Sequence, residues 1–178
     1  MKHADHVGLI RNGITGVGRR WLELGAGSGA FTLALADVLG PGAEIVAVDR
    51  DERELGRLRD SVSARYPEAT LGVVHADFRE PLPVDGRFDG LLAANALHFV
   101  ADPVPILRAI TPLIRSGGRV IVVEYDADDG NRWVPYPFSF ARWEALSTRA
   151  GLRSTRLIGR VPSQFLGAIY AAASDVGP

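Results

Sequence analysis

Short apolar runs alternate with amphipathic segments along this chain of 178 residues, and this alternation restricts the fold more than any other feature. A parallel sheet covered by helices produces such a pattern, because its strands are buried on both faces and its helices on one. Strands are expected at 21–24, 44–49, 71–75, 88–94 and 119–125, with helices around Phe31, Leu55 and Ile106 and at 140–150. The sequence therefore predicts one α/β domain over residues 1–178.

The remaining segments complete this layout. Residues 1–20 are expected to form a short N-terminal helical segment, and the polar, Pro- and Gly-containing stretch 126–137 is expected to be a loop on the substrate side. Apolar runs near 152–159 and 165–173, separated by Val161-Pro162-Ser163, predict an antiparallel hairpin over 152–174. Pro112 is expected to kink or shorten the helix that contains Ile106, Ile110 and Leu113 as its buried stripe.

Composition excludes several classes of protein. The chain has no cysteine, so disulfides, thiolate nucleophiles and cysteine-based metal sites are excluded, and its four scattered histidines predict no metal site. A net charge of -1 argues against non-specific nucleic-acid binding. No run of 18 apolar residues is present to span a membrane, and the first residues lack the apolar core of a signal peptide. We therefore expect a cytoplasmic protein.

A glycine cluster follows the first expected strand and precedes a helix. In the segment Glu23–Gly29, glycines permit positive φ and let a ligand approach the backbone, while the helix N-terminus favours an anionic group. The spacing Gly25-x-Gly27-x-x-Ala30, with Asp49 beyond it, also satisfies the dinucleotide pattern. A nucleotide-like ligand is predicted, and the glycine loop alone leaves its identity open.

Polar residues end the neighbouring strands. Asp49 can accept hydrogen bonds from ribose hydroxyls, or it can cap the next helix, for which Asp51 is better placed. Asp77 and Phe78 can bind and cover a base, or they can serve a turn and the core. Asn95 and His98 follow the fourth strand, where the crevice of a parallel sheet opens.

Five motifs in this order resemble the class I S-adenosylmethionine-dependent methyltransferases. The resemblance runs from about Trp21 to Glu124, and it rests on these segments: Glu23-x-Gly25-x-Gly27-x-Gly29, Asp49, Ala76-Asp77, 88–95 and 113–118. It implies a Rossmann-like three-layer sandwich with strand order 3-2-1-4-5-7-6 and strand 7 antiparallel. It also implies S-adenosylmethionine as the cofactor, and methyl transfer to a small-molecule acceptor by in-line displacement.

The resemblance further implies roles for individual residues. The loop backbone would pass beneath the methionine moiety, Glu23 would orient the loop near the cofactor's amino group, and Asp49 would hold the ribose. Arg50, Asp77 and Phe78 would surround the adenine, and the backbone of Asn95 would face the methionine end. The implied cofactor-binding residues are Glu23, Gly25, Ala26, Gly27, Gly29, Asp49, Arg50, Asp77, Phe78 and Asn95.

His98 is the candidate catalytic base, because it follows the fourth strand and an imidazole titrates near neutral pH; the alternative is a structural histidine. Tyr125, Trp133 and Tyr136 are the candidate substrate residues. Glu124, Tyr125 and Asp126 end the fifth strand at the same crevice, and at least one of them is expected to touch substrate; Glu124 could equally pair with an arginine. The chain lacks an Asn-Pro-Pro-Tyr tetrapeptide after the fourth strand, which disfavours methylation of nucleic-acid amino groups, and the first 20 residues are too few to cover the site well.

Three other functions remain open at this point. Residues 131–160 carry six arginines and one acid, Glu144, which favours either a solvated basic face or an anionic macromolecular acceptor. A protein that binds the cofactor without catalysis is a second alternative. A nicotinamide oxidoreductase would need a hydride-transfer acid such as a Tyr–Lys pair, and Lys2 is the sole lysine. The exposed site would be covered by the loop 126–137 or by a second copy of the chain in a homodimer.

Overall fold

The computed structural model describes residues 1–14 and 16–177; Thr15 of the predicted N-terminal segment and Pro178 at the predicted domain end lie outside the described residues. The elements are α1 His3–Ile14, β1 Arg20–Leu24, α2 Ala30–Leu39, β2 Glu44–Asp49, α3 Glu52–Arg65, β3 Thr70–His75, β4 Phe88–Ala94, η1 Leu97–Phe99, α4 Val104–Ile110, η2 Thr111–Leu113, β5 Ile114–Tyr125, α5 Phe140–Arg149, β6 Leu152–Pro162 and β7 Ala168–Val176. In this described part of the chain, no helix is both long and apolar enough to cross a membrane.

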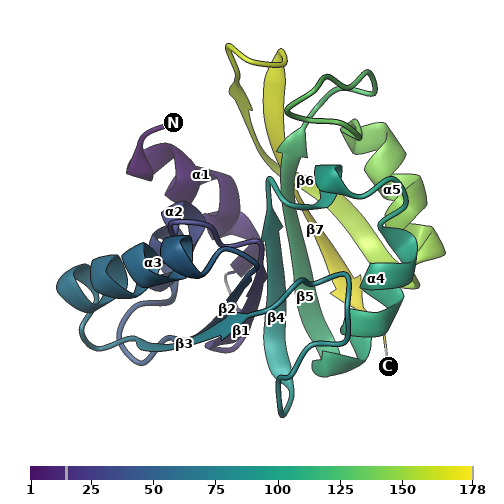
Figure 1. Ribbon diagram of the computed structural model, residues 1–178. Helices are drawn as coiled ribbons and strands as arrows, with labels where there is room; N and C mark the ends of the chain where they lie inside the picture. Colours follow the sequence, from purple (N-terminus) through teal and green to yellow (C-terminus); the bar gives the residue numbers. More distant parts are fainter. Residues whose placement is uncertain (15, 178) are drawn as a thin grey trace.

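The strands form one seven-stranded sheet in the order β3-β2-β1-β4-β5-β7-β6. The pairs from β3 to β5 are parallel, and β7 runs antiparallel to both β5 and β6. Helices α1–α3 cover one face of the sheet and α4 and α5 cover the other (Figure 1). The predicted fold class, strand order and direction of β7 are confirmed.

Local chemistry explains the helix boundaries. Asp51 is the N-cap of α3 and its carboxylate accepts from the backbone N–H groups of Arg53 and Glu54, so the cap is Asp51 rather than Asp49. Helix α4 ends at Ile110 and gives way to a 3₁₀ turn that contains Pro112, as expected for a residue without a backbone N–H. The buried side chains of α4 are Val104, Leu107 and Ile110. Ile106 and Leu113, predicted in the buried stripe, are only partly buried.

The C-terminal hairpin departs from the predicted strand boundaries. Strand β7 begins at Ala168, whereas the sequence pattern predicts a strand from Phe165. Gly167 adopts φ 64°, and its carbonyl accepts from the N–H of Ser163 at 2.8 Å. The Ser163 hydroxyl accepts from the N–H of Phe165 at 3.1 Å, which closes a compact turn. Phe165 therefore lies at the hairpin tip, beside the carboxyl end of β5.

The close packing of β4 on β1 yields a stability prediction. A Cβ at Gly90 would lie 2.5 Å from the ring of buried Trp21, so Gly90→Ala overpacks the centre of the sheet. We expect it to lower the free energy of unfolding by about 1–3 kcal/mol, measured by urea denaturation. Gly72→Ala is the matched strand control, because its Cβ would lie 3.6 Å from Val46, an ordinary contact. Equal stability of the two variants would contradict the packing of Gly90 on Trp21.

Candidate functional site

The glycine loop between β1 and α2 requires glycine at its two ends. Gly25 and Gly29 have φ angles of 67° and 92°, and Gly29 is the N-cap of α2. A Cβ added at Gly25 would lie 2.7 Å from the Cβ of Ala96, and a Cβ added at Gly29 would lie 2.9 Å from the Cγ of Leu58. Gly27 also has a positive φ, of 52°, but a Cβ there would meet nothing within 4 Å. The loop thus packs closely at both ends and presents open backbone at its middle.

The carboxylate of Asp49 is fixed beside this loop. One of its oxygens accepts from the N–H of Gly27 at 2.7 Å, and the other accepts from the N–H of Asp51 at 2.8 Å. A carboxylate oxygen has two lone pairs, so each oxygen retains the capacity to accept a further hydrogen bond. Asp49 is therefore a preoriented acceptor, as a ribose site requires.

A cleft of about 450 Å³ opens above these strand ends. It is lined by Gly25, Gly27, Asp49, Arg50, Asp51, Ala76, Asp77, Phe78, Arg79, Phe99 and Val100. Six of the predicted cofactor residues line it: Gly25, Gly27, Asp49, Arg50, Asp77 and Phe78. The other four, Glu23, Ala26, Gly29 and Asn95, do not line this cleft. The other five lining residues were not among the predicted cofactor residues: Asp51, Ala76, Arg79, Phe99 and Val100.

Arg79 engages the predicted adenine residue Asp77. The Arg79 guanidinium forms a bidentate ion pair with the Asp77 carboxylate, which also accepts from the Arg79 backbone N–H at 3.0 Å. This hydrogen-bonded arginine lowers the pKa of Asp77 below its ordinary value. Asp77 therefore remains ionised, with its orientation fixed by Arg79. No spacing rule marks such a pair within a loop, so sequence analysis had no signal for Arg79.

Glu23 lies beneath the loop rather than in the cleft. Its side chain is buried, and one carboxyl oxygen accepts from the Thr32 hydroxyl at 2.6 Å. Burial raises the pKa of Glu23 to about 8, which the charge of Asp49 reinforces and the Thr32 hydrogen bond opposes. At neutral pH, Glu23 is therefore a largely protonated carboxyl group under the loop.

Glu124, at the end of β5, forms a buried pair with His98. Its Oε1 accepts from the backbone N–H groups of Ala96, Leu97 and His98 at 3.2, 2.9 and 3.3 Å. Its Oε2 lies 2.6 Å from the Nδ1 of His98. An ionised carboxylate can only accept, so with Glu124 ionised Nδ1 is the donor and a neutral His98 carries its lone pair on Nε2. The expectation that Glu124 touches substrate or pairs with an arginine is wrong, because its carboxylate is fully buried against His98 and this turn.

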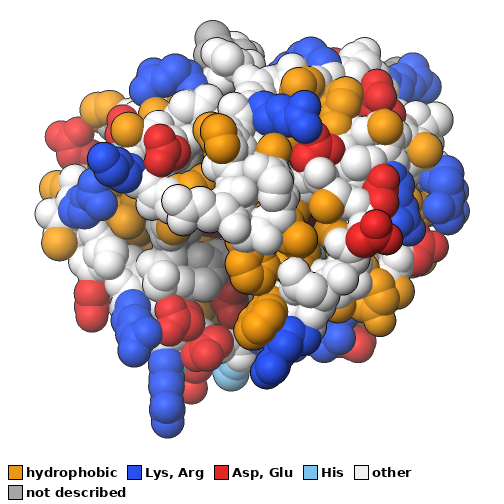
Figure 2. Space-filling view, turned by 90° about the horizontal axis from the view of Figure 1, so that it is seen from above, with side chains coloured by type: hydrophobic (Ala, Val, Ile, Leu, Met, Phe, Trp, Pro, Cys, Tyr) orange, Lys and Arg blue, Asp and Glu red, His pale blue; other side chains and the backbone are white. Residues whose placement is uncertain are grey.

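A second cavity, of about 350 Å³, lies beside the cleft and is largely aromatic. It is lined by Asn95, His98, Phe99, Tyr125, Trp133, Val134 and Phe165. The Phe165 ring centroid lies 5.8 Å from that of Tyr125 and 6.0 Å from that of Trp133. Figure 2 views this end of the molecule, where hydrophobic side chains gather among charged ones.

Only two of the three predicted substrate residues line the aromatic cavity. Tyr125 and Trp133 line the aromatic cavity, whereas the side chain of Tyr136 does not. The backbone N–H of Tyr136 instead donates to the His98 carbonyl at 2.9 Å, which ties the loop to the turn after β4. Phe165 was missed because its predicted place was inside a strand.

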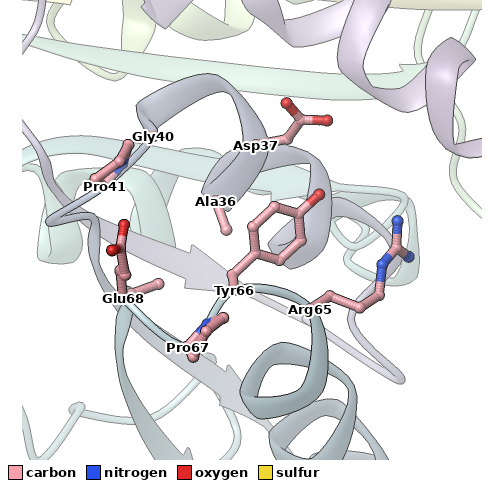
Figure 3. Close-up of a pocket in the computed structure, with 9 residues that line it drawn as sticks. Ala36, Asp37, Gly40, Pro41, Arg65, Tyr66, Pro67 and Glu68 are labelled. Atoms are coloured by element: carbon pink, nitrogen blue, oxygen red, sulfur yellow. The ribbon is translucent and has the colours of Figure 1, made fainter.

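Another cavity, of about 360 Å³, lies between the C-terminal ends of α2 and α3 (Figure 3). Tyr66 projects into it between Asp37 and Arg65, and the Tyr66 hydroxyl lies 3.3 Å from the Nε2 of His3. This cavity adjoins the amino ends of β2 and β3, opposite the strand ends that carry the glycine loop. Within residues 1–14 and 16–177, no cluster of His, Asp or Glu is arranged to hold a metal ion.

The basic stretch 131–160 is partly neutralised by acids from elsewhere in the chain. Arg149 pairs with Asp102 at 3.4 Å, Arg156 with Asp175 at 3.5 Å and Arg160 with Asp126 at 2.5 Å. Half of the six arginines are therefore committed to ion pairs. This weakens the case for an anionic macromolecule bound along this stretch.

Comparison with known proteins identifies the family. The model of the methyltransferase domain family matches residues 22–122, which contain the glycine loop, Asp49 and the end of β4. The chain belongs to the class I S-adenosylmethionine-dependent methyltransferases. S-adenosylmethionine is the cofactor of this family, and the resemblance drawn from the motifs is confirmed.

Individual methyltransferases show the extent of the similarity. The ubiquinone/menaquinone biosynthesis C-methyltransferase UbiE of Ectopseudomonas mendocina is 30% identical over 129 residues, which cover 69% of this chain and 50% of that protein. A probable cobalt-precorrin-6B C(15)-methyltransferase of Thermoplasma volcanium is 27% identical over 116 residues, covering 65% of this chain and 55% of that protein. The chain spans about half the length of these curated relatives.

The fold recurs in solved structures. The YcgJ protein from Bacillus subtilis superimposes with a TM-score of 0.77 at 15% identity, covering 99% of this chain and 100% of that one. At this identity the likeness concerns the fold, which agrees with the seven-stranded sheet described above.

The buried carboxyl of Glu23 predicts a distinctive pH dependence of stability. Its pKa rises from 4.5 to about 8 on folding, so between these values the folded state holds a proton that the unfolded state has lost. The free energy of unfolding therefore falls as the pH rises through this window. Glu23→Gln is neutral at every pH, and its stability relative to the native chain should rise by a few kcal/mol, in order of magnitude, from pH 5 to pH 8.

Urea denaturation at pH 5, 6.5 and 8 measures this difference. The control is Glu68→Gln, which makes the same change at an exposed position. Parallel pH profiles for Glu23→Gln and the native chain would show that Glu23 is ionised in the folded state.

Proposed function

We propose that this chain transfers a methyl group from S-adenosylmethionine to a small-molecule acceptor. The observation that carries the proposal is that the glycine-loop cleft and the aromatic cavity meet at Phe99, which lines both. A cofactor site and an acceptor site are therefore contiguous, as direct transfer between two bound molecules requires. The name of the UbiE relative, a C-methyltransferase of quinone biosynthesis, supports an acceptor of small-molecule size.

The residues of the cleft fit the cofactor. Asp49 would accept from the ribose hydroxyls, since both its oxygens are fixed and retain free lone pairs. Asp77 would accept from the adenine amino group, with Arg79 holding the carboxylate in place and Phe78 against the base. The open backbone at Gly27 and the Asn95 backbone would face the methionine end. Glu23 would support the loop from below.

S-adenosylmethionine, when bound, supplies a methyl group that is already activated on a sulfonium. The protein therefore has to position the acceptor, keep water out and remove a proton where the acceptor carries one. Trp133 and Phe165 would form the wall of the acceptor cavity. His98 would take the proton on Nε2, because Glu124 fixes Nδ1 as the hydrogen-bond donor.

A protein that binds the cofactor without catalysis remains the second candidate. It is favoured by the wide exposure of Trp133 and Phe165, which are 59% and 48% exposed and leave the acceptor cavity open. A screen for methyl transfer from labelled S-adenosylmethionine to small acceptors separates the two functions. Transfer to an acceptor establishes the enzyme, whereas cofactor binding without any transfer favours the second candidate.

Asp49 tests the placement of the cofactor. Asp49→Ala removes the ribose acceptor and should weaken binding of S-adenosylhomocysteine by about 1.5–3 kcal/mol, measured by calorimetry. Asp51→Asn is the control, because it changes the same charge in the same cleft and asparagine also caps a helix well. NADH should not bind usefully. Unchanged affinity in a folded Asp49→Ala protein would place the ribose elsewhere, and tight NADH binding alone would overturn the proposed cofactor.

His98 tests the base. His98→Asn keeps a side-chain N–H for Glu124 but offers no basic nitrogen, whereas His98→Ala removes both. We expect His98→Asn to retain most of the stability and the S-adenosylhomocysteine affinity while kcat falls by about 10²–10⁴ for an acceptor that must lose a proton. Steady-state kinetics and thermal unfolding of both variants measure this. If His98→Asn has a normal kcat and His98→Ala does not fold, His98 is a structural residue and not the base.

A further inference from the structure

Asn95 combines two features that its place in the sheet does not explain, a positive φ and a buried side-chain oxygen without a partner. It follows β4 directly, with a φ of 51° that is uncommon for a residue with a side chain. Its backbone N–H donates to the Val123 carbonyl at 2.8 Å, so the backbone is held in place. Its side-chain oxygen Oδ1 is buried and has no hydrogen-bond partner among the described residues. Both the backbone conformation and the orphaned oxygen cost stability, and such costs concentrate at functional sites.

Asn95 also lies where two cavities meet. It lines the aromatic cavity with His98, and it lines a neighbouring cavity of about 660 Å³ between the start of α1 and the hairpin tip. Tyr125 and Phe165 line both cavities as well. Lys2 and Asp5 of the N-terminal segment line this larger cavity, and neither lines the aromatic cavity.

We infer that the side-chain amide of Asn95 hydrogen-bonds a hydroxyl or amino group of the methyl acceptor, and that the acceptor is a flat aromatic compound bearing that group. The inference rests on the proposed function and assigns the acceptor of the same site. Tyr125 and Phe165 line the same two cavities as Asn95, and their rings suit a flat apolar body. A turn about the last side-chain bond breaks no hydrogen bond of Oδ1, which has no partner among the described residues, and would present the amide oxygen to the donor group of the ligand.

The side chain of Asn95 can be removed without straining the backbone. Glycine adopts a φ near 51° readily, so Asn95→Gly deletes the amide and relieves the backbone, whereas alanine would add strain. Ser154 is the other described non-glycine residue with positive φ, of 52°, and it lies exposed in β6. Ser154→Gly is therefore the matched control. Asn95→Asp keeps acceptor oxygens and tolerates the same φ.

The probes are 2-naphthol and 2-methylnaphthalene, which differ in a hydroxyl group exchanged for a methyl group. Binding to the protein saturated with S-adenosylhomocysteine is measured by ligand-observed NMR titration. We expect the native chain, Ser154→Gly and Asn95→Asp to prefer 2-naphthol by roughly tenfold, and Asn95→Gly to lose that preference. Affinity for S-adenosylhomocysteine should persist in Asn95→Gly, because the contact expected there uses the backbone.

The outcomes separate the two proposals. A native chain that does not bind S-adenosylhomocysteine overturns the proposed function. A native chain that binds S-adenosylhomocysteine but shows no preference for 2-naphthol, or binds neither probe, overturns the role of Asn95 alone. A preference for 2-naphthol that persists in folded Asn95→Gly also overturns the role of Asn95 alone.

Discussion

The buried carboxylate of Glu124 holds together the end of the molecule where the glycine-loop cleft and the aromatic cavity meet. It accepts from three consecutive backbone N–H groups after β4 and from the His98 ring. A carboxylate buried without such partners would be strongly unfavourable, so the turn 96–98 and the carboxylate require each other. This contact joins the ends of β4 and β5. The positions of Asn95, His98 and Phe99 all depend on it.

The sequence predicted the fold because its signals are local. Strand β4 reads as a continuous apolar run, α3 shows its buried face at Leu55, Leu58 and Val62, and the glycine loop sits between a strand and a helix. Strand ends in a parallel sheet meet along one edge, which is why Asp49, Asp77 and Phe78 were brought to one cleft. The order of the strands came from the family resemblance rather than from periodicity.

Contacts between distant or aperiodic residues could not be predicted in the same way. Glu124 and His98 are 26 positions apart, and either residue alone has an ordinary structural interpretation. Arg79 reached the cleft through an ion pair within a loop, where no periodicity applies. Phe165 was assigned to a strand because the pattern near it is apolar, and the turn at Gly167 moved it to the tip. The first two of these errors concern side-chain contacts at the site, and the third concerns the start of one strand; the order of the strands was unaffected.

The hairpin tip has a consequence for how such a protein can diversify. Phe165 stands outside the β6–β7 ladder. The last pair of that ladder is Pro162 with Ala168, so the residues between them are not paired as strands. Insertions or exchanges in this tip would alter the wall of the aromatic cavity while leaving the sheet and the glycine loop untouched. Under the proposed function, the choice of acceptor can therefore change in evolution independently of the residues at the ends of β1–β3, since the hairpin and these strands lie on opposite sides of β4.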